Sequence, residues 1–181
     1  WASLFSGYPY LYAIPTHGWN TSKVTSFYNL FYNCYCLSSV GDLTNWNTSA
    51  LTGTALQGTF NGCWNLTNIG DLSAWNTSNV TSFSALFSGC YKLERVKGIN
   101  NWNTAKVANM TSMFNSCYRI TDIGDLSNWD VSKVTSFNSM FTACQNIKRI
   151  TGLKNWNIGS CTTLTGMFST CYNLEYIDDL T

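Results

Sequence analysis

The sequence contains few charged residues, and their signs almost balance. Ten basic and nine acidic residues among 181 give a formal net charge of +1. A nucleic-acid-binding domain would carry clustered lysine and arginine side chains, so this composition argues against a nucleic-acid partner. Long hydrophobic runs are also absent, because no stretch approaches the roughly 18 apolar residues that a membrane-spanning helix requires. The surface is therefore expected to consist mainly of Asn, Ser, Thr and Gly residues.

Residues suited to metal binding or catalysis are scarce. His17 is the single histidine and the chain has no C-x-x-C pair, so no metal site is predicted. Asp42, Asp71 and Asp125 recur in Gly-Asp-Leu segments, where a turn-forming role explains them better than general acid–base chemistry does. We therefore predict a protein that is not an enzyme and has no cofactor.

The sequence is instead built on a tandem repeat of tryptophan and cysteine. Six tryptophans open a Trp-Asn or Trp-Asp pair at steps of 27 residues, with one step of 29: Trp19, Trp46, Trp75, Trp102, Trp129 and Trp156. Six cysteines follow them at an offset of 15 residues, or 17 in the second repeat: Cys34, Cys63, Cys90, Cys117, Cys144 and Cys171. A fixed period of about 20 to 50 residues is typical of solenoids, propellers and other arrays.

The repeats predict one solenoid over residues 1–181. A partial repeat covers residues 1–18, full repeats begin at residues 19, 46, 75, 102 and 129, and residues 156–181 form a last, incomplete repeat. Neither a helical nor an alternating hydrophobic period persists through a whole repeat. We predict a right-handed coil with short β-strands around Val-Thr-Ser-Phe and Leu-x-x-Ile and a helical turn at Met-Phe-x-x-Cys. Stacked strands lie about 4.8 Å apart, so equal positions of successive coils should touch.

The segment WNTSNVTSF-SA-LFSGCYKLERV, residues 75–96, resembles the BspA-type leucine-rich repeats. It resembles more closely the WDTSNVTDMSxMF-type repeats of mycoplasma and lactobacillus surface proteins, and the likeness extends over essentially the whole chain. The resemblance implies a leucine-rich-repeat solenoid that is extracellular or on a cell surface and acts in adhesion or host interaction. It implies no shared catalytic residues. The departures are Tyr8 in a cysteine slot, the insertion after Trp46, and Cys161 in place of valine.

Eight cysteines in a surface protein suggest disulfides. Six of them, however, recur once per repeat, each with Phe three residues before it and Leu or Ile three residues after it. A small buried thiol explains this placement without a bond. We therefore predict a reduced cysteine column in the core, in preference to bridges. Cys36 lies outside the column, in a slot otherwise filled by Asn, Lys or Arg, and is expected to be exposed.

A second aromatic column follows the cysteines directly. Its members are Tyr35, Trp64, Tyr91, Tyr118 and Tyr172, with Gln145 in the remaining repeat. Because the cysteine points inwards, its neighbour should face solvent, and Tyr and Trp combine apolar area with a polar tip. The leading hypothesis is a non-catalytic cell-surface binding module that recognises a host or neighbouring-cell protein or glycan through this column. The alternative is that these rings only stack on one another between coils.

Three further patterns carry alternatives. Apolar residues near both ends, such as Phe5 and Ile177, predict either a segment of a longer array or copies that stack end to end into a filament. A threonine row interrupted by Ala108 would suit ice binding, although threonine also favours strands. A column of asparagines should bond to turn backbone, in preference to carrying glycans at N-x-S/T sequons: Asn20, Asn47, Asn76, Asn103 and Asn157, with Asp130. Finally, Asp122 shares a slot with Arg95 and Arg149, which predicts paired charges between coils.

Overall fold

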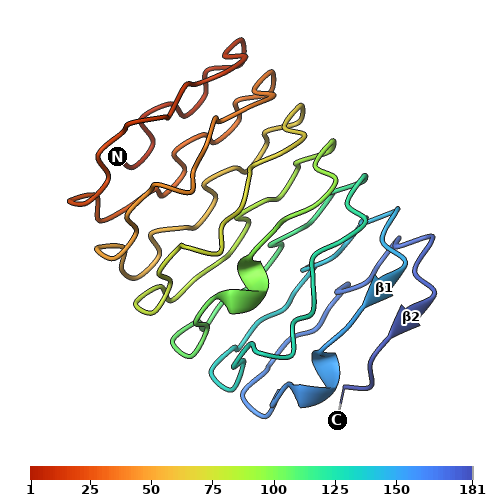
Figure 1. Cartoon of the computed structure of the whole chain (residues 1–181). Coiled ribbons are helices and arrows are strands. Elements are labelled where there is room, and N and C mark those ends of the chain that lie inside the picture. The colour runs from red at the N-terminus through yellow and green to blue at the C-terminus, as the bar shows by residue number, and fades with distance from the viewer. Residues whose placement is uncertain (181) are drawn as a thin grey trace.

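The computed structural model describes residues 1–180, which wind into a stack of similar coils with the two termini at opposite ends (Figure 1). Regular secondary structure is sparse. β1 spans Arg149–Ile150 and β2 spans Tyr176–Ile177, and the two pair in parallel. Two 3-10 helices, η1 at Ile99–Asn101 and η2 at Leu153–Asn155, occupy equivalent turns two coils apart.

Single parallel β-bridges join neighbouring coils elsewhere, at the places where short strands are predicted. Along Val-Thr-Ser-Phe, Ser82 bridges Asn109 and Ser136 bridges Thr163. Along Leu-x-x-Ile, the bridged column includes Ser39 with Asn68 and Arg95 with Asp122. These four bridges join equal positions of successive repeats, whereas the bridges of Asp71 with Lys97 and of Asp125 with Thr151 are offset by one residue. The predicted strands are thus reduced to one or two bridged residues in each coil.

The helical turn predicted at Met-Phe-x-x-Cys is wrong. The residues two before and two after the phenylalanine have positive φ in each coil, as Asn29 (50°) and Asn33 (58°) do around Phe31. A right-handed helix cannot continue through two left-handed residues, so the segment folds into consecutive tight turns. Its N–H groups alternate in direction. The N–H of Tyr32 donates to the carbonyl of Asn29 (3.1 Å) in its own coil, whereas that of Phe31 donates to the next coil (2.9 Å).

Columns of equal side chains fill the interior. The phenylalanine rings stack at centroid distances of 5.4 to 5.7 Å from coil to coil: Phe5, Phe31, Phe60, Phe87, Phe114, Phe141 and Phe168. In the tryptophan column, the rings of Trp46 and Trp75 are 6.2 Å apart and nearly parallel. The indole N–H of Trp102 donates to the carbonyl of Leu72 (3.0 Å), and three other tryptophans make the equivalent bond: Trp75, Trp129 and Trp156. These bonds tie each coil to the one before it.

The cysteine column is a second set of ties between coils. Each thiol donates to the carbonyl of the column phenylalanine one coil earlier, for example Cys90 to Phe60 (3.2 Å) and Cys117 to Phe87 (3.1 Å). All eight cysteines are free. Cys36, expected to be exposed, is half-buried, and its backbone N–H donates to the carbonyl of Pro9 (3.1 Å) in the coil before.

A buried polar column is not anticipated by the sequence analysis. The threonine of the Trp-Asn-Thr segment is buried in four coils: Thr21, Thr48, Thr77 and Thr104. The hydroxyl of Thr77 donates to the carbonyl of Asn103 in the next coil (2.9 Å), and that of Thr104 donates to Asp130 (2.8 Å). Composition alone assigns threonine to the surface, but a satisfied hydroxyl can be buried.

The charge pairing predicted around Asp122 is also wrong. Its backbone lies in register with Arg95, but its carboxylate accepts the N–H of Gly124 (2.8 Å), which fixes the turn. Within residues 1–180, the ion pair formed is between the exposed side chains of Lys148 and Glu175 (3.6 Å), in the neighbouring column.

Candidate functional site

Four of the five predicted surface aromatics form one continuous stack along a flank of the solenoid. Tyr35, Trp64, Tyr91 and Tyr118, here called the aromatic stack, have successive ring centroids 4.0, 5.5 and 4.8 Å apart. The interplanar angles lie between 11° and 26°. Tyr172 is not part of this stack, because Gln145 occupies the coil between them.

The aromatic stack offers ring edges to solvent, since each ring covers a face of the next. Trp64 is 40% exposed and the three tyrosines are half-buried. Asn65 donates to the backbone carbonyl of Tyr35 (3.0 Å), but the polar tips of the four side chains have no partner within residues 1–180. Burial, together with neighbouring Tyr118 and Tyr35, raises the pKa of Tyr91. Its phenol therefore remains a hydrogen-bond donor at neutral pH.

The residues next to the aromatic stack change from neutral to basic along the chain. Asn65 follows Trp64, whereas the exposed Lys92 and Arg119 follow Tyr91 and Tyr118. In the whole chain, charged residues of both signs are concentrated after residue 90, because only three precede it: Lys23, Asp42 and Asp71. One side of the molecule thus combines an aromatic row with cations at one end only.

A row of exposed tyrosines on the first coil is missed by the sequence analysis. Tyr8, Tyr10 and Tyr12 are 60%, 79% and 65% exposed. In the sequence they are marked by tyrosine at every second position of the segment YPYLY, a pattern with a period of two that the 27-residue repeat does not contain. Unlike the aromatic stack, these rings have open faces.

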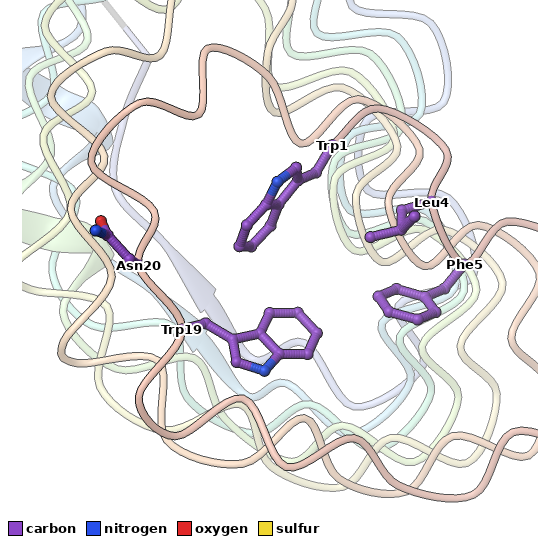
Figure 2. Close-up of a pocket in the computed structure, with 5 residues that line it drawn as sticks. All are labelled: Trp1, Leu4, Phe5, Trp19 and Asn20. Carbon is purple, nitrogen blue, oxygen red and sulfur yellow. The ribbon is translucent and has the colours of Figure 1, made fainter.

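Both end faces of the solenoid expose apolar side chains. At the N-terminal end, Trp1, Leu4 and Phe5 face Trp19 across a hollow of about 420 Å³, with Asn20 at its rim (Figure 2). The ring of Trp1 meets that of Trp19 edge-on at 5.4 Å. At the other end, the exposed side chains include Leu164, Tyr172, Tyr176 and Ile177.

The backbones of the two end faces are complementary. Ser139 and Phe141 donate N–H groups to the following coil, but within residues 1–180 their equivalents Gly166 and Phe168 have no acceptor. On the first coil, the carbonyl of Leu4 has no donor among residues 1–180, although that of its equivalent Leu30 accepts the N–H of Phe5 (3.0 Å). A row of donors at one end therefore matches a row of acceptors at the other.

Comparison with known proteins identifies a family and a fold for this chain. The chain matches the family described as "Mycoplasma protein of unknown function, DUF285" over residues 2–63 and again over residues 54–178. The chain belongs to this family. No curated protein matches the sequence.

The fold of this DUF285 protein is similar to that of a solved leucine-rich repeat protein. The leucine-rich repeat protein TpLRR of T. pallidum superposes with a TM-score of 0.60 at 17% identity, covering 96% of this chain and 69% of that chain. A leucine-rich repeat protein from Bacteroides ovatus covers 96% of the chain at 15% identity, and a leucine rich cell surface protein from Faecalibacterium prausnitzii covers 82% at 17% identity. Their TM-scores are 0.25 and 0.26, and 68% and 74% of those chains are covered. The TpLRR match shows a leucine-rich-repeat fold, and the family match confirms the resemblance to the mycoplasma repeats.

The aspartates of the Gly-Asp-Leu segments bond to the backbone of their own turns. Asp42, Asp71 and Asp125 each accept the backbone N–H two residues later, at 2.8 to 2.9 Å. The asparagine column does the same, as Asn47 accepts the N–H of Ser49 (3.0 Å). In the part of the chain that the structure describes, no three His, Cys, Asp or Glu side chains group as metal ligands. No helix in the same part is both long and apolar enough to cross a bilayer.

Proposed function

We propose that this DUF285 solenoid is a non-catalytic binding module at the cell surface and that the aromatic stack is its recognition surface. The observation that supports this proposal most is the set of four outward polar tips without internal partners. None of these tips is a buried unpaired group, so they face solvent and a ligand can replace the water around them. Tyrosine and tryptophan are also the residue types that dominate binding energy at interfaces.

The arrangement favours a ligand with regularly spaced acceptors. Ring faces are occupied within the aromatic stack, so a partner meets ring edges, hydroxyl groups and an indole N–H. Lys92 and Arg119 extend the row of donors at one end. A host or neighbouring-cell protein or glycan with acceptor groups repeated along its length fits such a row. The likeness of the repeats to bacterial surface repeats supports the location.

The test separates the polar tips from the rings. The variant Tyr91→Phe/Tyr118→Phe keeps the stacked rings and removes two hydroxyls, so we expect an unchanged fold and weaker binding in a screen of surface proteins and glycans. Tyr91→Ala/Tyr118→Ala should weaken binding further. Tyr28→Ala/Tyr32→Ala, two half-buried tyrosines outside the stack, is the control. Equal binding by all variants would show that the aromatic stack is only packing.

The end faces support a second candidate, end-to-end assembly. Matching donor and acceptor rows, together with the hollow around Trp1 and Trp19, would let a further coil continue the stack from a second copy. The expected result is a sedimentation coefficient that rises with protein concentration. Leu164→Asp, which places a charge on one end face, should abolish the rise, whereas Thr135→Asp on the flank should not. A mass independent of concentration would exclude assembly by this chain.

A further inference from the structure

A polar hollow lies between two coils, and none of its lining residues belongs to the aromatic stack. It has a volume of about 350 Å³, and the side chains that line it include Ser38, Ser39, Asp42, Thr67 and Asn68. Small-molecule sites have volumes of roughly 300 to 1,000 Å³, so one sugar ring is of suitable size. The lining consists of hydroxyl, amide and carboxylate groups.

Three of these side chains are held in place and still have hydrogen-bonding capacity. The hydroxyl oxygen of Ser39 accepts the N–H of Gly41 (3.2 Å), which leaves its own proton to donate. Asn68 accepts the N–H of Gly70 (2.8 Å) through its side-chain oxygen, and its NH₂ group has no partner within residues 1–180. Fixed side chains cost a ligand little ordering entropy.

Asp42 supplies an acceptor in the same way. One carboxylate oxygen accepts both the backbone N–H (2.9 Å) and the hydroxyl (2.7 Å) of Thr44. The other oxygen has no partner in the described part of the chain. These bonds, and to a smaller extent the charge of His17, lower the pKa of Asp42, so it is a carboxylate at neutral pH.

Tyr12 lies in the coil before the hollow, next to Ser38, which lines it. It occupies the slot of Ser38 one coil earlier, and both the N–H and the hydroxyl of Ser38 donate to its backbone carbonyl (2.9 and 3.0 Å). Its ring is 65% exposed and Tyr10, two residues before, is 79% exposed. An open tyrosine face is a flat apolar surface beside a polar hollow.

We propose that this hollow binds a neutral sugar ring, which lays its C–H face on Tyr12 and bonds its hydroxyls to Ser39, Asp42 and Asn68. A sugar hydroxyl both donates and accepts, and the hollow presents donors and an acceptor in the same small volume. The neutral character of the first half of the chain suits an uncharged ligand. The site is separate from the aromatic stack and stands even if the stack binds nothing.

A matched hollow three repeats later has a different chemistry. It occupies the same slots, has a volume of about 410 Å³, and is lined by Asp122, Asp125, Lys148 and Arg149 among others. The guanidinium of Arg149 lies over the ring of Tyr176, 4.3 Å from its centroid. The second hollow holds four charged side chains where the first holds Asp42 alone, and two of them are the long side chains of Lys148 and Arg149, which occupy the slots of Thr67 and Asn68. A neutral sugar is therefore expected to prefer the first hollow.

The experiment titrates the full chain with methyl glycosides of neutral hexoses and with N-acetylglucosamine, and follows binding by ligand-observed NMR. Tyr12→Ala should weaken binding by about tenfold, since a stacked face is lost, and Asp42→Asn by at least as much. Asp125→Asn, the equivalent change in the charged hollow, should bind as the wild type does. Tyr91→Phe/Tyr118→Phe, in the aromatic stack, should also bind these sugars normally.

Each result decides the proposal. Binding that Tyr12→Ala and Asp42→Asn both reduce, and that Asp125→Asn leaves unchanged, supports it. No binding by any of the neutral sugars, or binding that neither of the first two variants alters, overturns it. Sugar binding lost only in the aromatic-stack variant would assign the sugar to that stack and would also overturn it. Because Tyr12 and Asp42 are exposed, unfolding is not expected, and circular dichroism of each variant verifies this.

Discussion

Left-handed backbone recurs on both sides of every column phenylalanine, and non-glycine residues occupy many of these positions. Ala85 (φ 52°) and Ala143 (φ 60°) are the simplest cases, because alanine offers no side-chain hydrogen bond to offset the strain. A left-handed conformation costs an L-residue about 1–2 kcal/mol. The fold accepts this cost because the N–H of each such residue then reaches the next coil, as that of Ala85 reaches Thr111 (2.9 Å).

Glycine at these positions should stabilise the protein. We expect Ala85→Gly and Ala143→Gly each to raise the free energy of unfolding by about 0.5–1 kcal/mol, since relieved strain exceeds the added chain entropy. Urea denaturation measures the change. Ala55→Gly is the matched control, because Ala55 is buried with an ordinary φ, and it should destabilise by about as much. Destabilisation by all three would contradict the left-handed assignment.

Trp46 is the exception among the buried tryptophans. Its indole N–H is the one buried side-chain group without a hydrogen bond in residues 1–180. The slot that provides the acceptor in other coils, as Leu72 does for Trp102, is filled in the first coil by Thr16. The backbone carbonyl of Thr16 accepts the N–H of Trp19 (3.1 Å) but not the indole N–H of Trp46.

Replacing tryptophan by phenylalanine should therefore cost different amounts in the two coils. Both Trp46→Phe and Trp102→Phe lose buried area. Trp102→Phe also loses the indole bond to Leu72, whose carbonyl keeps the backbone N–H of Trp75 (3.0 Å), whereas Trp46→Phe removes a buried N–H that has no acceptor within residues 1–180. An unsatisfied buried group costs about 1–3 kcal/mol, so Trp102→Phe should be the more destabilising variant by about that amount. Thermal and urea unfolding of the pair decide the matter. Equal losses would mean that the indole bonds contribute nothing.

The cysteine column ties the elements together and has a titration consequence. Burial raises the pKa of the thiols well above the ordinary value of 9.0 in Cys63, Cys90, Cys117 and Cys144, and to about 11 in Cys34. A thiol that ionises only when unfolded stabilises the native state fully below pH 9, and this stability is lost as pH rises towards the folded pKa. The column therefore predicts alkaline sensitivity.

The slope of the free energy of unfolding against pH depends on the number of buried thiols. Above about pH 9, each thiol that is ionised only in the unfolded state should lower the free energy of unfolding by about 1.4 kcal/mol per pH unit. Cys117→Ala removes one of them, so its slope should be smaller than that of the wild type by about this amount. Urea unfolding under reducing conditions at several pH values provides the comparison. Identical slopes would show that the thiols are accessible in the native state.

The repeat pattern predicts columns well and turns poorly. Equal spacing places Cys90 next to Cys117 in any solenoid, and the parallel bridges lie where Val-Thr-Ser-Phe and Leu-x-x-Ile indicate them. The turn at Met-Phe-x-x-Cys resembles a helix by spacing alone, because left-handed positions are filled by Asn, Ser, Ala and Thr as well as Gly. The burial of Thr77 cannot be predicted from the repeat either, because its hydroxyl can be buried only where a carbonyl of the next coil accepts its proton. The site residues divide in the same way: the stack follows from the column, whereas the hollow beside Tyr12 depends on turn geometry.

At the scale of the molecule, each coil contacts only its neighbours, so stability should vary with position along the stack. Phe114 is fully buried between Phe87 and Phe141, whereas Phe168 on the last coil is half-buried. Phe114→Ala should cost about 3–5 kcal/mol and Phe168→Ala distinctly less. Hydrogen exchange should show the end coils opening first. Uniform protection from end to end would indicate a single cooperative unit instead.

Beyond residue 70, Gly-Asp-Leu turns alternate with turns that contain η1 or η2. The repeating unit of this part of the chain is therefore two coils rather than one. η1 and η2 each begin after a left-handed glycine, Gly98 or Gly152, and a side chain at either would collide with the backbone of Ser73 or Ser127 in the Gly-Asp-Leu turn one coil earlier. In this part of the chain, a copying error that adds or removes 27 residues would break the alternation, as the successive Gly-Asp-Leu turns at Asp42 and Asp71 do before it, whereas an error of 54, the distance between Gly98 and Gly152, keeps the alternation. Related genes should therefore differ in length mostly by steps of two repeats, and a census of their repeat numbers will show whether even steps predominate.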